Sequence, residues 1–436
     1  MNFKHKNVLV YGLSVSGEWV SKLLLKLKAN VFLFDDNLEH LKKKTIKNCY
    51  MLPEINENYI SQLDFMVISP SIEKDNINLE YARKNDIKIF SELEFASLFC
   101  KNICAITGTN GKTTTTELVT QILNKKRKTI ACGNIGYPVS RAVLENKKHL
   151  KVMEVSSFML ENAETFSPKI ATVLNIAEDH VIRHKSMQEY TNLKMSIFKN
   201  LTSKDFAVVN LDNKIHPSQN CATVTYSYNH YADVYVKNGY IYIHTEKLMA
   251  INEIPLKGKH NIYNIMCAIC FGLAYKVKPS KIKQAILDFK ADKYRIEHIT
   301  KVNGVNFVND SKSTNIASTL ASVDTIKGSV ILLLGGSNKA LNYENLFNNL
   351  SKRVKQVVVF GEIAQDLINA NNSKFKIQHC INLNEAFDYA VSVAEKNDTV
   401  LLSPASASYD QFTNYIERGN AFNLKVKEYE KTCKQK

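Results

Sequence analysis

Short apolar runs alternate with amphipathic segments along the first part of the chain. Four of the runs are rich in β-branched and aromatic residues, and each is followed by Gly, Asp or Ser; they cover residues 8–11, 31–34, 65–68 and 87–90. Runs of this kind predict parallel strands that are connected by helices in a doubly wound sheet. We therefore predict a first domain over residues 1–91, with ligands at the carboxyl ends of its strands.

The alternation continues beyond residue 91. Further strands are predicted at 103–107, 151–155, 171–175 and 206–210, and a helix at 280–289, where apolar residues recur at helical spacing after Pro279. This gives a central domain over 92–290. A third domain over 291–436 has strands predicted at 330–334, 356–360 and 399–402.

The predicted fold class is α/β, with three domains that each contain a mainly parallel, doubly wound sheet. The first and last domains are expected to be Rossmann-like and the central one P-loop-type. A chain of 436 residues exceeds what one core usually serves, about 250 residues. Neither an internal repeat nor a long low-complexity linker separates the domains, so we expect them to share one site.

The strongest local motif is a strand that breaks into a glycine turn and then a helix, at Ala-Ile-Thr-Gly-Thr-Asn-Gly-Lys-Thr-Thr (105–114). Gly108 and Gly111 let backbone amides turn toward anionic oxygens, and the helix start adds a positive dipole. Lys112 adds a full charge, and the Thr113 hydroxyl suits Mg²⁺. Ile106 stands where the common P-loop has glycine, so this is a shorter variant. We predict ATP binding, and the alternative is a threonine-rich helix cap without a ligand.

A second glycine turn, at residues 12–17, follows the first predicted strand. The helix start after it can receive a diphosphate, and Asp35 ends the second strand, where such folds place an acid that binds a ribose or base. A purely structural turn and an NAD site are the alternatives.

Three more residues are candidates for a functional role, and each of them also has a common structural explanation. Glu154 ends a predicted strand, which suits a carboxylate that holds Mg²⁺, but exposed acids also occur there. Lys194 lies in a predicted helix over 190–198, where a solvated lysine is the usual expectation. His180 follows Asp179, and a lone histidine is more often a packing residue.

Composition narrows the class of protein. The chain has 45% hydrophobic and 23% charged residues, which is typical of a globular protein. The net charge is +15, but the lysines are dispersed without an aromatic-interleaved basic stripe, so we expect no nucleic-acid partner. Nine cysteines are scattered without paired metal-ligand spacing, apart from Cys267 and Cys270. Because no second ligand pair lies near these two, they are predicted to be buried helix thiols.

The sequence also bears on location. The first apolar run is too short for a signal peptide, and no apolar stretch approaches the roughly 20 residues that cross a bilayer. We expect no membrane insertion and a cytoplasmic protein.

The phosphate loop resembles that of the Mur ligases and of the related folylpolyglutamate synthetases. Further stretches in the family's order extend the resemblance over essentially the whole chain: 134–136, 154–161, 178–180, 259–261 and 309–315. Residues 156–161 and 402–412 resemble the branch of the family that adds D-glutamate. The Asp-Asn-Pro-Arg type sequence of the branch that adds diaminopimelate or lysine is not found, and a separate first domain with its own glycine turn disfavours the folate branch.

The resemblance implies an ATP-dependent amide ligase of peptidoglycan synthesis. Its substrates would be UDP-N-acetylmuramoyl-L-alanine and D-glutamate, joined through an acyl phosphate with the help of two Mg²⁺ ions, and a monomer is expected. The alternatives are a Mur-type ligase for another amino acid and a non-catalytic nucleotide-binding homologue.

The resemblance also implies residue roles. Catalytic roles fall to Lys112, His180 and Lys194. The metal ligands would be Thr113, Glu154, His180 and, if carbamylated, Lys194. ATP would be bound by Gly108, Thr109, Asn110, Gly111, Lys112, Thr113, Thr114, Asn261, Arg295, Asp310 and Lys312. The UDP-substrate would be bound by Ser14, Val15, Asp35, Asn134 and Ser156, and the amino acid by Thr314, Lys339, Ser403 and Phe412.

Several positions depart from the family pattern. Ile182 replaces an aspartate, Tyr294 a histidine, Ser337-Asn338 an Asp-Gly pair and Ser406 a cysteine. By resemblance, these changes fall around the metal and glutamate sites.

Overall fold

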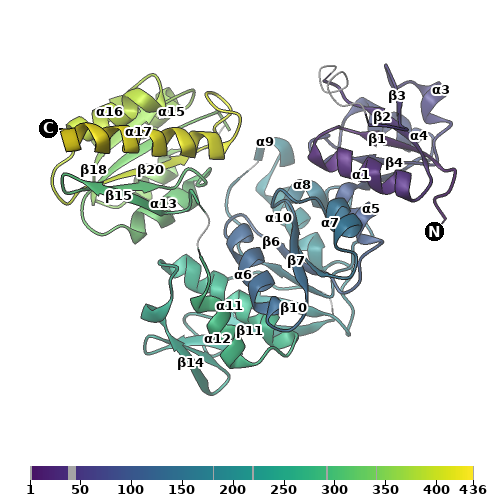
Figure 1. Cartoon of the computed structure of the whole chain (residues 1–436), viewed down its shortest axis with the longest axis horizontal. Helices are drawn as coiled ribbons and strands as arrows, with labels where there is room; N and C mark the ends of the chain where they lie inside the picture. The colour runs from purple at the N-terminus through teal and green to yellow at the C-terminus, as the bar shows by residue number, and fades with distance from the viewer. Residues whose placement is uncertain are drawn as a thin grey trace. The chain divides into compact units, whose positions relative to one another are not determined.

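The computed structural model describes residues 2–37, 46–179, 181–218, 220–290, 293–339 and 341–435. Within these ranges the chain forms three β-sheets with flanking helices (Figure 1). It divides into two compact units. The first unit comprises the residues up to Ile176, Arg183–Ile254 and Tyr263–Phe289, and the second comprises Ala177–Ile182, Pro255–Ile262 and the residues from Lys290 onward.

The first sheet confirms the doubly wound prediction. Its strands are all parallel in the order β3-β2-β1-β4-β5. The strands are β1 Asn7–Tyr11, β2 Asn30–Phe34, β3 Tyr50–Met51, β4 Phe65–Ile68 and β5 Lys88–Ser91. The helices are α1 Val15–Lys26, α3 Glu57–Ile60, α4 Ile77–Lys84 and α5 Glu92–Ser97. The order reverses direction between β1 and β4, which is where such sheets bind ligands.

The second sheet has the order β14-β13-β12-β11-β10-β9-β6-β8-β7. Its parallel strands are β6 Cys104–Thr107, β7 Thr129–Gly133, β8 Leu150–Glu154, β9 Ile170–Val173, β10 Phe206–Asn210 and β11 Ala222–Ser227. The next strand, β12 Val234–Lys237, is parallel to β11, and β13 Tyr240–Ile243 and β14 Glu246–Ala250 then extend the sheet with antiparallel pairs. Because β6 lies between β8 and β9, residues that follow all three strands meet at one edge.

Helices flank this second sheet. They are α6 Lys112–Asn124, α7 Val139–Glu145, α8 Ser157–Leu160, α9 Val181–His184, α10 Met187–Met195, α11 Lys259–Ala274 and α12 Pro279–Leu287, with short 3₁₀ turns η1 Ser196–Phe198 and η2 Ile251–Glu253. Four apolar residues stand at helical spacing after the phosphate loop, and all are buried: Leu118, Val119, Ile122 and Leu123. Cys267 and Cys270 are free, buried thiols of α11, which confirms the prediction for them.

The third sheet has the order β15-β16-β20-β17-β18-β19 and is parallel except for the β15–β16 hairpin. Its strands are β15 Glu297–Val302, β16 Val305–Asn309, β17 Val330–Gly335, β18 Val354–Phe360, β19 Ile377–His379 and β20 Thr399–Ala405. The helices are α13 Ile316–Thr325, α14 Glu344–Asn349, α15 Ala364–Ala370, α16 Leu383–Ser392 and α17 Tyr415–Gln435.

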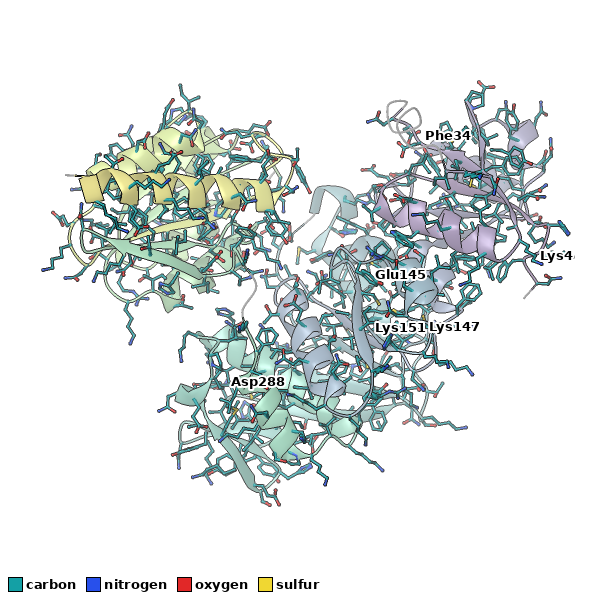
Figure 2. All side chains as sticks on the ribbon, in the orientation of Figure 1. Lys4, Phe34, Glu145, Lys147, Lys151 and Asp288 are labelled. Atoms are coloured by element: carbon teal, nitrogen blue, oxygen red, sulfur yellow. The ribbon has the colours of Figure 1, made fainter. Side chains whose placement is uncertain are left out.

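Many charged side chains lie on the surface, but some are buried, and Lys151 is one of these (Figure 2). Lys147 and Asp288 are exposed, whereas Lys151 is 2% exposed. Its ammonium group donates hydrogen bonds to the carbonyl oxygens of Asn146, Lys147 and His149, so its polar end remains satisfied. In the described part of the chain, every helix is too short or too polar to span a bilayer.

The first two sheets share one apolar core, which accounts for their joining in a single compact unit. The residue Phe95 of α5 is fully buried within it. Its ring centroid lies 5.6 Å from that of Phe3, 5.8 Å from Phe65, 6.1 Å from Phe90 and 5.5 Å from Phe99. The predicted boundary at residue 91 therefore falls just before a helix that packs on the first sheet, and the domain boundaries stay a prediction.

Replacing Phe95 with Ala should lower the free energy of unfolding by about 3–5 kcal/mol, because it leaves a cavity in this core. Leu98→Ala, at the 41% exposed C-cap residue of the same helix, is the matched control and should have a much smaller effect. Urea unfolding followed by the fluorescence of Trp19, the only tryptophan, measures both. Equal midpoints for the two variants would contradict the shared core.

Candidate active site

The predicted phosphate loop is held in place by its own glycines and by the strand next to it. Gly108 has φ +150° and Gly111, the N-cap of α6, has φ +83°. A Cβ at Gly111 would lie 2.4 Å from Oδ1 of Asn264, so the Asn264 side chain or the turn would have to shift. Asn175, just after β9, accepts a hydrogen bond from the Asn110 amide (2.9 Å) and donates one to the Asn110 carbonyl (3.0 Å). These contacts within the protein hold the backbone of the phosphate loop in its conformation.

Two lysines converge on this loop. The Lys112 ammonium donates to the carbonyl oxygens of Gly108 (2.9 Å) and Thr109 (2.8 Å), and the Lys194 ammonium also donates to Gly108 (2.9 Å). Lys194 is only 1% exposed and lies 4.6 Å from the centroid of the Tyr190 ring. The ordinary expectation of a solvated helix lysine is therefore wrong at this position. The side chains of Thr113 and Thr114 are half-buried in the first turn of α6.

Glu154 is the candidate metal ligand that the structure describes most fully. It ends β8 beside β6, where it pairs in register with Ile106, and it is 2% exposed. Its Oε1 accepts a hydrogen bond from Asn134 (2.8 Å), while Oε2 is buried and has no hydrogen-bond partner among the described residues. An exposed strand-end acid is thus excluded. A buried carboxylate oxygen without a donor is suited to a cation.

The described residues do not assemble a complete metal site. No group of three or more His, Cys, Asp or Glu side chains gathers around a common point within the described ranges. His180, the expected second ligand, lies outside the described residues, as does the side chain of Ile182. The fit of a metal ion therefore depends on Glu154 and Thr113.

The glycine turn of the first domain opens into a cavity of about 280 Å³. It brings together three of the predicted UDP-substrate residues, Ser14, Val15 and Asn134, and its other lining residues are Ser16, Pro70, Glu92, Gly133, Gly136, Pro138 and Met159. The cavity lies at the β1–β4 reversal, because the Ser14 hydroxyl is 3.0 Å from that of Ser69, which follows β4.

The other two predicted UDP-substrate residues have structural contacts of their own. The Asp35 carboxylate accepts hydrogen bonds from the backbone amides of Leu13 (2.5 Å) and Asn37 (2.9 Å), and so fixes the glycine turn. Ser156 caps α8 by accepting a hydrogen bond from the amide of Met159 (3.4 Å). Neither residue lines the cavity.

In the second unit, two predicted ligand-binding residues face each other inside the fold. Asp310 and Ser403 are both fully buried, and the Ser403 hydroxyl donates to Asp310 Oδ2 (2.8 Å). Burial raises the pKa of the Asp310 carboxyl, while the neighbouring Arg295 charge opposes that shift. Arg295 itself donates to the Ser313 hydroxyl (3.1 Å). The structure thus places Asp310 and Ser403 as supports of the loops after β16 and β20.

The predicted amino-acid residues Lys339 and Thr314 lie together in the second unit. The Lys339 ammonium donates to the Thr314 carbonyl (3.1 Å) and lies 3.3 Å from Asp179 Oδ1. Asn315 donates to the other oxygen of Asp179 (3.3 Å). Phe412 is half-buried against the apolar core of this unit. The Lys339 ammonium and the Asp179 carboxylate thus lie side by side, and this part of the second unit is suited to binding charged groups.

Two predicted nucleotide residues of the second unit have their own local contacts. The Asn261 side chain is 6% exposed and donates to the Lys257 carbonyl (2.7 Å). The Lys312 ammonium lies 5.7 Å from the centroid of the Tyr415 ring.

Arg418 is a central residue that the sequence did not reveal. It is fully buried, and its guanidinium donates hydrogen bonds to oxygens of four residues: Ser311, Gly335, Ser406 and Ala407. These acceptors lie at the end of β17 and just after β16 and β20. Burial lowers the pKa of Arg418, but five donated bonds favour its charged form. In the sequence Arg418 is one of many charged residues in α17, and nothing around it indicates that its side chain is buried.

Three of the departures from the family pattern have defined surroundings. Ser406 and Ser337 contact each other, since the Ser406 hydroxyl donates to the Ser337 carbonyl (2.5 Å). Tyr294 has a left-handed backbone (φ +63°), and its hydroxyl donates to Asn420 (2.7 Å). Each replacement is therefore accommodated by a local hydrogen bond.

Known protein families match both units. The Mur ligase middle domain matches residues 106–272, and the Mur ligase, glutamate ligase domain matches residues 294–406. The chain is 34% identical over 446 residues to the UDP-N-acetylmuramoylalanine--D-glutamate ligase of Caldanaerobacter subterraneus subsp. tengcongensis, covering 98% of this chain and 99% of that protein. Proteins of the same name from Koribacter versatilis and Clostridioides difficile are 36% and 33% identical, with 98% of this chain and 98% and 99% of those proteins covered.

Solved structures share the fold at lower identity. MurF ligase from Thermotoga maritima, in complex with ADP, gives a TM-score of 0.61 at 16% identity, covering 98% of this chain and 96% of that one. A pseudomurein peptide ligase type C from Methanothermus fervidus gives 0.61 at 20% identity, covering 91% and 96%. At these identities the likeness concerns the fold alone.

Gly111→Ala should weaken ATP binding at least about tenfold, because its Cβ would meet Asn264 Oδ1 at 2.4 Å, so that either the Asn264 side chain or the turn must move. Gly239→Ala is a matched control. Its φ of +76° imposes a similar backbone strain, but a Cβ there meets nothing within 4 Å. Calorimetric titration with ATP measures both variants. Equal affinities would show that the glycine turn does not form the nucleotide site.

Proposed function

The chain belongs to the Mur ligase family, and from this premise we propose that it joins D-glutamate to UDP-N-acetylmuramoyl-L-alanine with ATP. The observation that carries the proposal is sequence identity. Three ligases with this activity in their name are 34–36% identical to the chain, and each match covers 98% of it. The products would be UDP-N-acetylmuramoyl-L-alanyl-D-glutamate, ADP and phosphate. This reaction belongs to the synthesis of the peptidoglycan precursor.

An amide cannot form directly from a carboxylate at a useful rate, because oxide would be the leaving group. In the proposed reaction a carboxylate oxygen of the alanyl group attacks the γ-phosphorus of ATP and ADP departs. The amine of D-glutamate then attacks the acyl carbon, and phosphate leaves with the electron pair. The residues of the protein must therefore hold three reactants in line and neutralise the transferring phosphoryl group.

The phosphate loop supplies most of the required positive charge. The backbone turn at Gly108 to Gly111 and the N-terminus of α6 would receive the phosphates of ATP, and Lys112 would approach the transferring group. Glu154 and Thr113 would hold one Mg²⁺ ion, which is supported by the buried, unpartnered Oε2 of Glu154. When bound, Mg²⁺ neutralises charge that develops on the phosphoryl oxygens.

We further propose that Lys194 is carbamylated in the active protein and, with His180, holds a second Mg²⁺. The support is its environment: a buried ammonium group is costly, and Lys194 shares one carbonyl acceptor with Lys112. The neutral amine of Lys194 would attack carbon dioxide, forming an N–C bond and releasing a proton. The carbamate would replace this second cation with an anion, which removes the repulsion and supplies an oxygen ligand. The role of His180 rests on the resemblance.

The two organic substrates are assigned to different places. The cavity at Ser14, Val15 and Asn134 would receive the UDP-substrate, and Lys339 with Thr314 would bind the carboxylates of D-glutamate. One chain supplies all of these groups, so we propose a monomer as the active form. We place the reaction in the cytoplasm, where ATP and soluble UDP-linked precursors are available.

The proposal predicts that ADP release requires both UDP-N-acetylmuramoyl-L-alanine and D-glutamate. A coupled ADP assay with a panel of amino acids measures this, and L-glutamate, L-lysine and diaminopimelate should give less than about a hundredth of the rate. A preference for another amino acid would reassign the branch of the family. No ADP release with any of them would leave a non-catalytic nucleotide-binding protein.

Glu154→Gln should lower kcat at least about a hundredfold, because the amide cannot supply the negative charge that holds Mg²⁺. It should not lower the thermal unfolding temperature, since it removes a buried carboxylate that has one oxygen without a donor. Glu145→Gln, at an exposed acid, is the control and should keep full activity. Unchanged kcat in Glu154→Gln would refute the metal role.

A further inference from the structure

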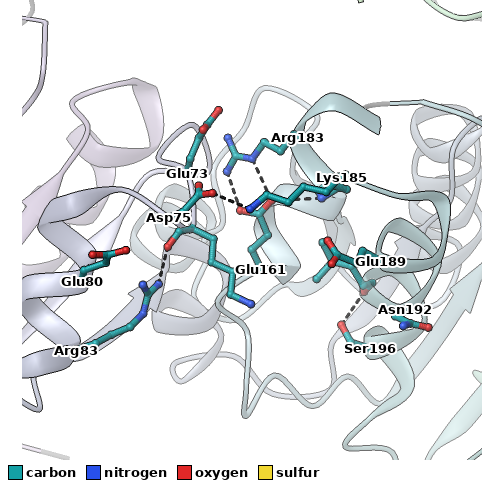
Figure 3. A pocket seen from close by; sticks show the side chains of 13 residues that line it. Glu73, Asp75, Glu80, Arg83, Glu161, Arg183, Lys185, Glu189, Asn192 and Ser196 are labelled. Atoms are coloured by element: carbon teal, nitrogen blue, oxygen red, sulfur yellow. Dashed lines mark hydrogen bonds and ion pairs between the residues drawn. The ribbon is translucent and has the colours of Figure 1, made fainter. Parts of the chain in front are cut away.

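Arg183, on α9, binds two segments that are far apart in the sequence. Its guanidinium holds Glu161 through two hydrogen bonds, of 3.0 Å and 2.7 Å (Figure 3). It also donates to the backbone carbonyls of Pro70 (3.1 Å), Ser71 (3.1 Å) and Ile72 (2.9 Å). The side chains of Arg183 and Glu161 are 15% and 7% exposed, so these bonds are largely shielded from water.

The three carbonyls belong to the loop that forms one wall of the proposed UDP-substrate cavity. Pro70 lines that cavity directly. Ser69 connects to Ser14 through a hydroxyl contact of 3.0 Å, and Ser71 donates to Ser69 (3.1 Å). Arg183 therefore fixes the conformation of the cavity wall from outside, without reaching into the cavity itself.

The next residue, His184, connects in the other direction to the phosphate loop. Its Nε2 is 3.0 Å from the Ser157 hydroxyl, and its ring stacks on Phe158 (5.4 Å) and packs against Tyr190 (5.3 Å). The Tyr190 hydroxyl in turn lies 3.2 Å from that of Thr109 in the phosphate loop. Burial lowers the pKa of His184, which favours the neutral ring in this packing.

We propose that Arg183 and His184 form a positioning pair that couples the UDP-substrate cavity to the phosphate loop. Ordering of the loop at residues 70–72 by the UDP-substrate fixes Arg183, and through His184 and Tyr190 this favours the nucleotide-binding form of the phosphate loop. Thermodynamic linkage requires that ATP then favours binding of the UDP-substrate by the same factor. This inference rests on the proposed function.

The structure supplies a matched control beside the pair. Lys185, two residues after Arg183, forms an ion pair of 2.9 Å with Asp75, three residues after Ile72, but the two side chains are 69% and 59% exposed (Figure 3). The pair lies on the rim of a cavity of about 690 Å³ that Arg183 and His184 also line. Exposed ion pairs contribute little because water and salt screen them. If any ion pair in this region were enough to couple the UDP-substrate cavity to the phosphate loop, the exposed pair of Lys185 and Asp75 would contribute to the coupling as well.

The test is the affinity for a non-hydrolysable ATP analogue, measured by calorimetry with and without saturating UDP-N-acetylmuramoyl-L-alanine. In the unmodified protein the UDP-substrate should tighten nucleotide binding at least about fivefold. Arg183→Lys, which keeps the charge but loses the forked contacts, should reduce this ratio to less than about twofold. Lys185→Ala should leave it unchanged. His184→Ala should also lose the coupling, and His184→Phe, which keeps the ring packing, should retain more of it.

The outcomes separate this inference from the proposed function. If the unmodified protein releases no ADP with both substrates, the proposed function fails. If it is active but Arg183→Lys and His184→Ala keep the full affinity ratio, or Lys185→Ala loses it equally, the coupling role of the pair is wrong. Thermal unfolding of each variant confirms that it is folded, and His184→Ala decides the question if Arg183→Lys does not fold.

Discussion

Positive charge concentrated around one carbonyl oxygen is the constraint on which the rest of the site depends. Lys112 and Lys194 approach Gly108 from two different helices, and their ammonium groups share its oxygen at 2.9 Å each. Two ammonium groups that share one acceptor repel each other, and water screens this repulsion only weakly at Lys194 because that side chain is buried. The loop is therefore prepared for an anion, and a nucleotide triphosphate or a carbamate on Lys194 would each relieve the repulsion.

The strand order explains why the complementary groups lie nearby. With β6 between β8 and β9, the phosphate loop, Glu154 and Asn175 all follow the carboxyl ends of neighbouring parallel strands. Asn175 fixes the loop backbone, and Glu154 offers a buried oxygen that lacks a donor. The third sheet repeats the principle, since the loops after β16, β17 and β20 are joined by Arg418. In both units a parallel sheet gathers loops, and a few buried polar side chains fix their shape.

The sequence revealed the buried parallel strands well and the edges of the sheets poorly. Central strands such as β17 are continuous apolar runs, because helices cover both faces of a parallel sheet. The strands β12 to β14 at one edge of the second sheet and the hairpin partner β15 mix Lys, Tyr and Glu with apolar residues, so they do not stand out as strands. Their pairing is decided by neighbours distant in the chain, which local patterns do not encode.

The candidate active site, too, could be predicted from the sequence only in part. The phosphate loop could be predicted from its residues alone, because glycine, lysine and threonine have fixed physical roles there. The burial of Lys194 could not, since a lysine on a short amphipathic helix is normally solvated and only the fold turns it inward. Asn175 and Arg418 act through single side chains without any motif. His180 lies outside the described residues, so its role continues to rest on resemblance.

The central claim is that this charged loop transfers a phosphoryl group to a carboxylate. Its most direct test is to label both carboxylate oxygens of the UDP-substrate with ¹⁸O and analyse the phosphate released with ATP and D-glutamate by mass spectrometry. Transfer through an acyl phosphate predicts one ¹⁸O atom in each phosphate. Phosphate without label would contradict the account, because it would mean that ATP is cleaved without activating the acid.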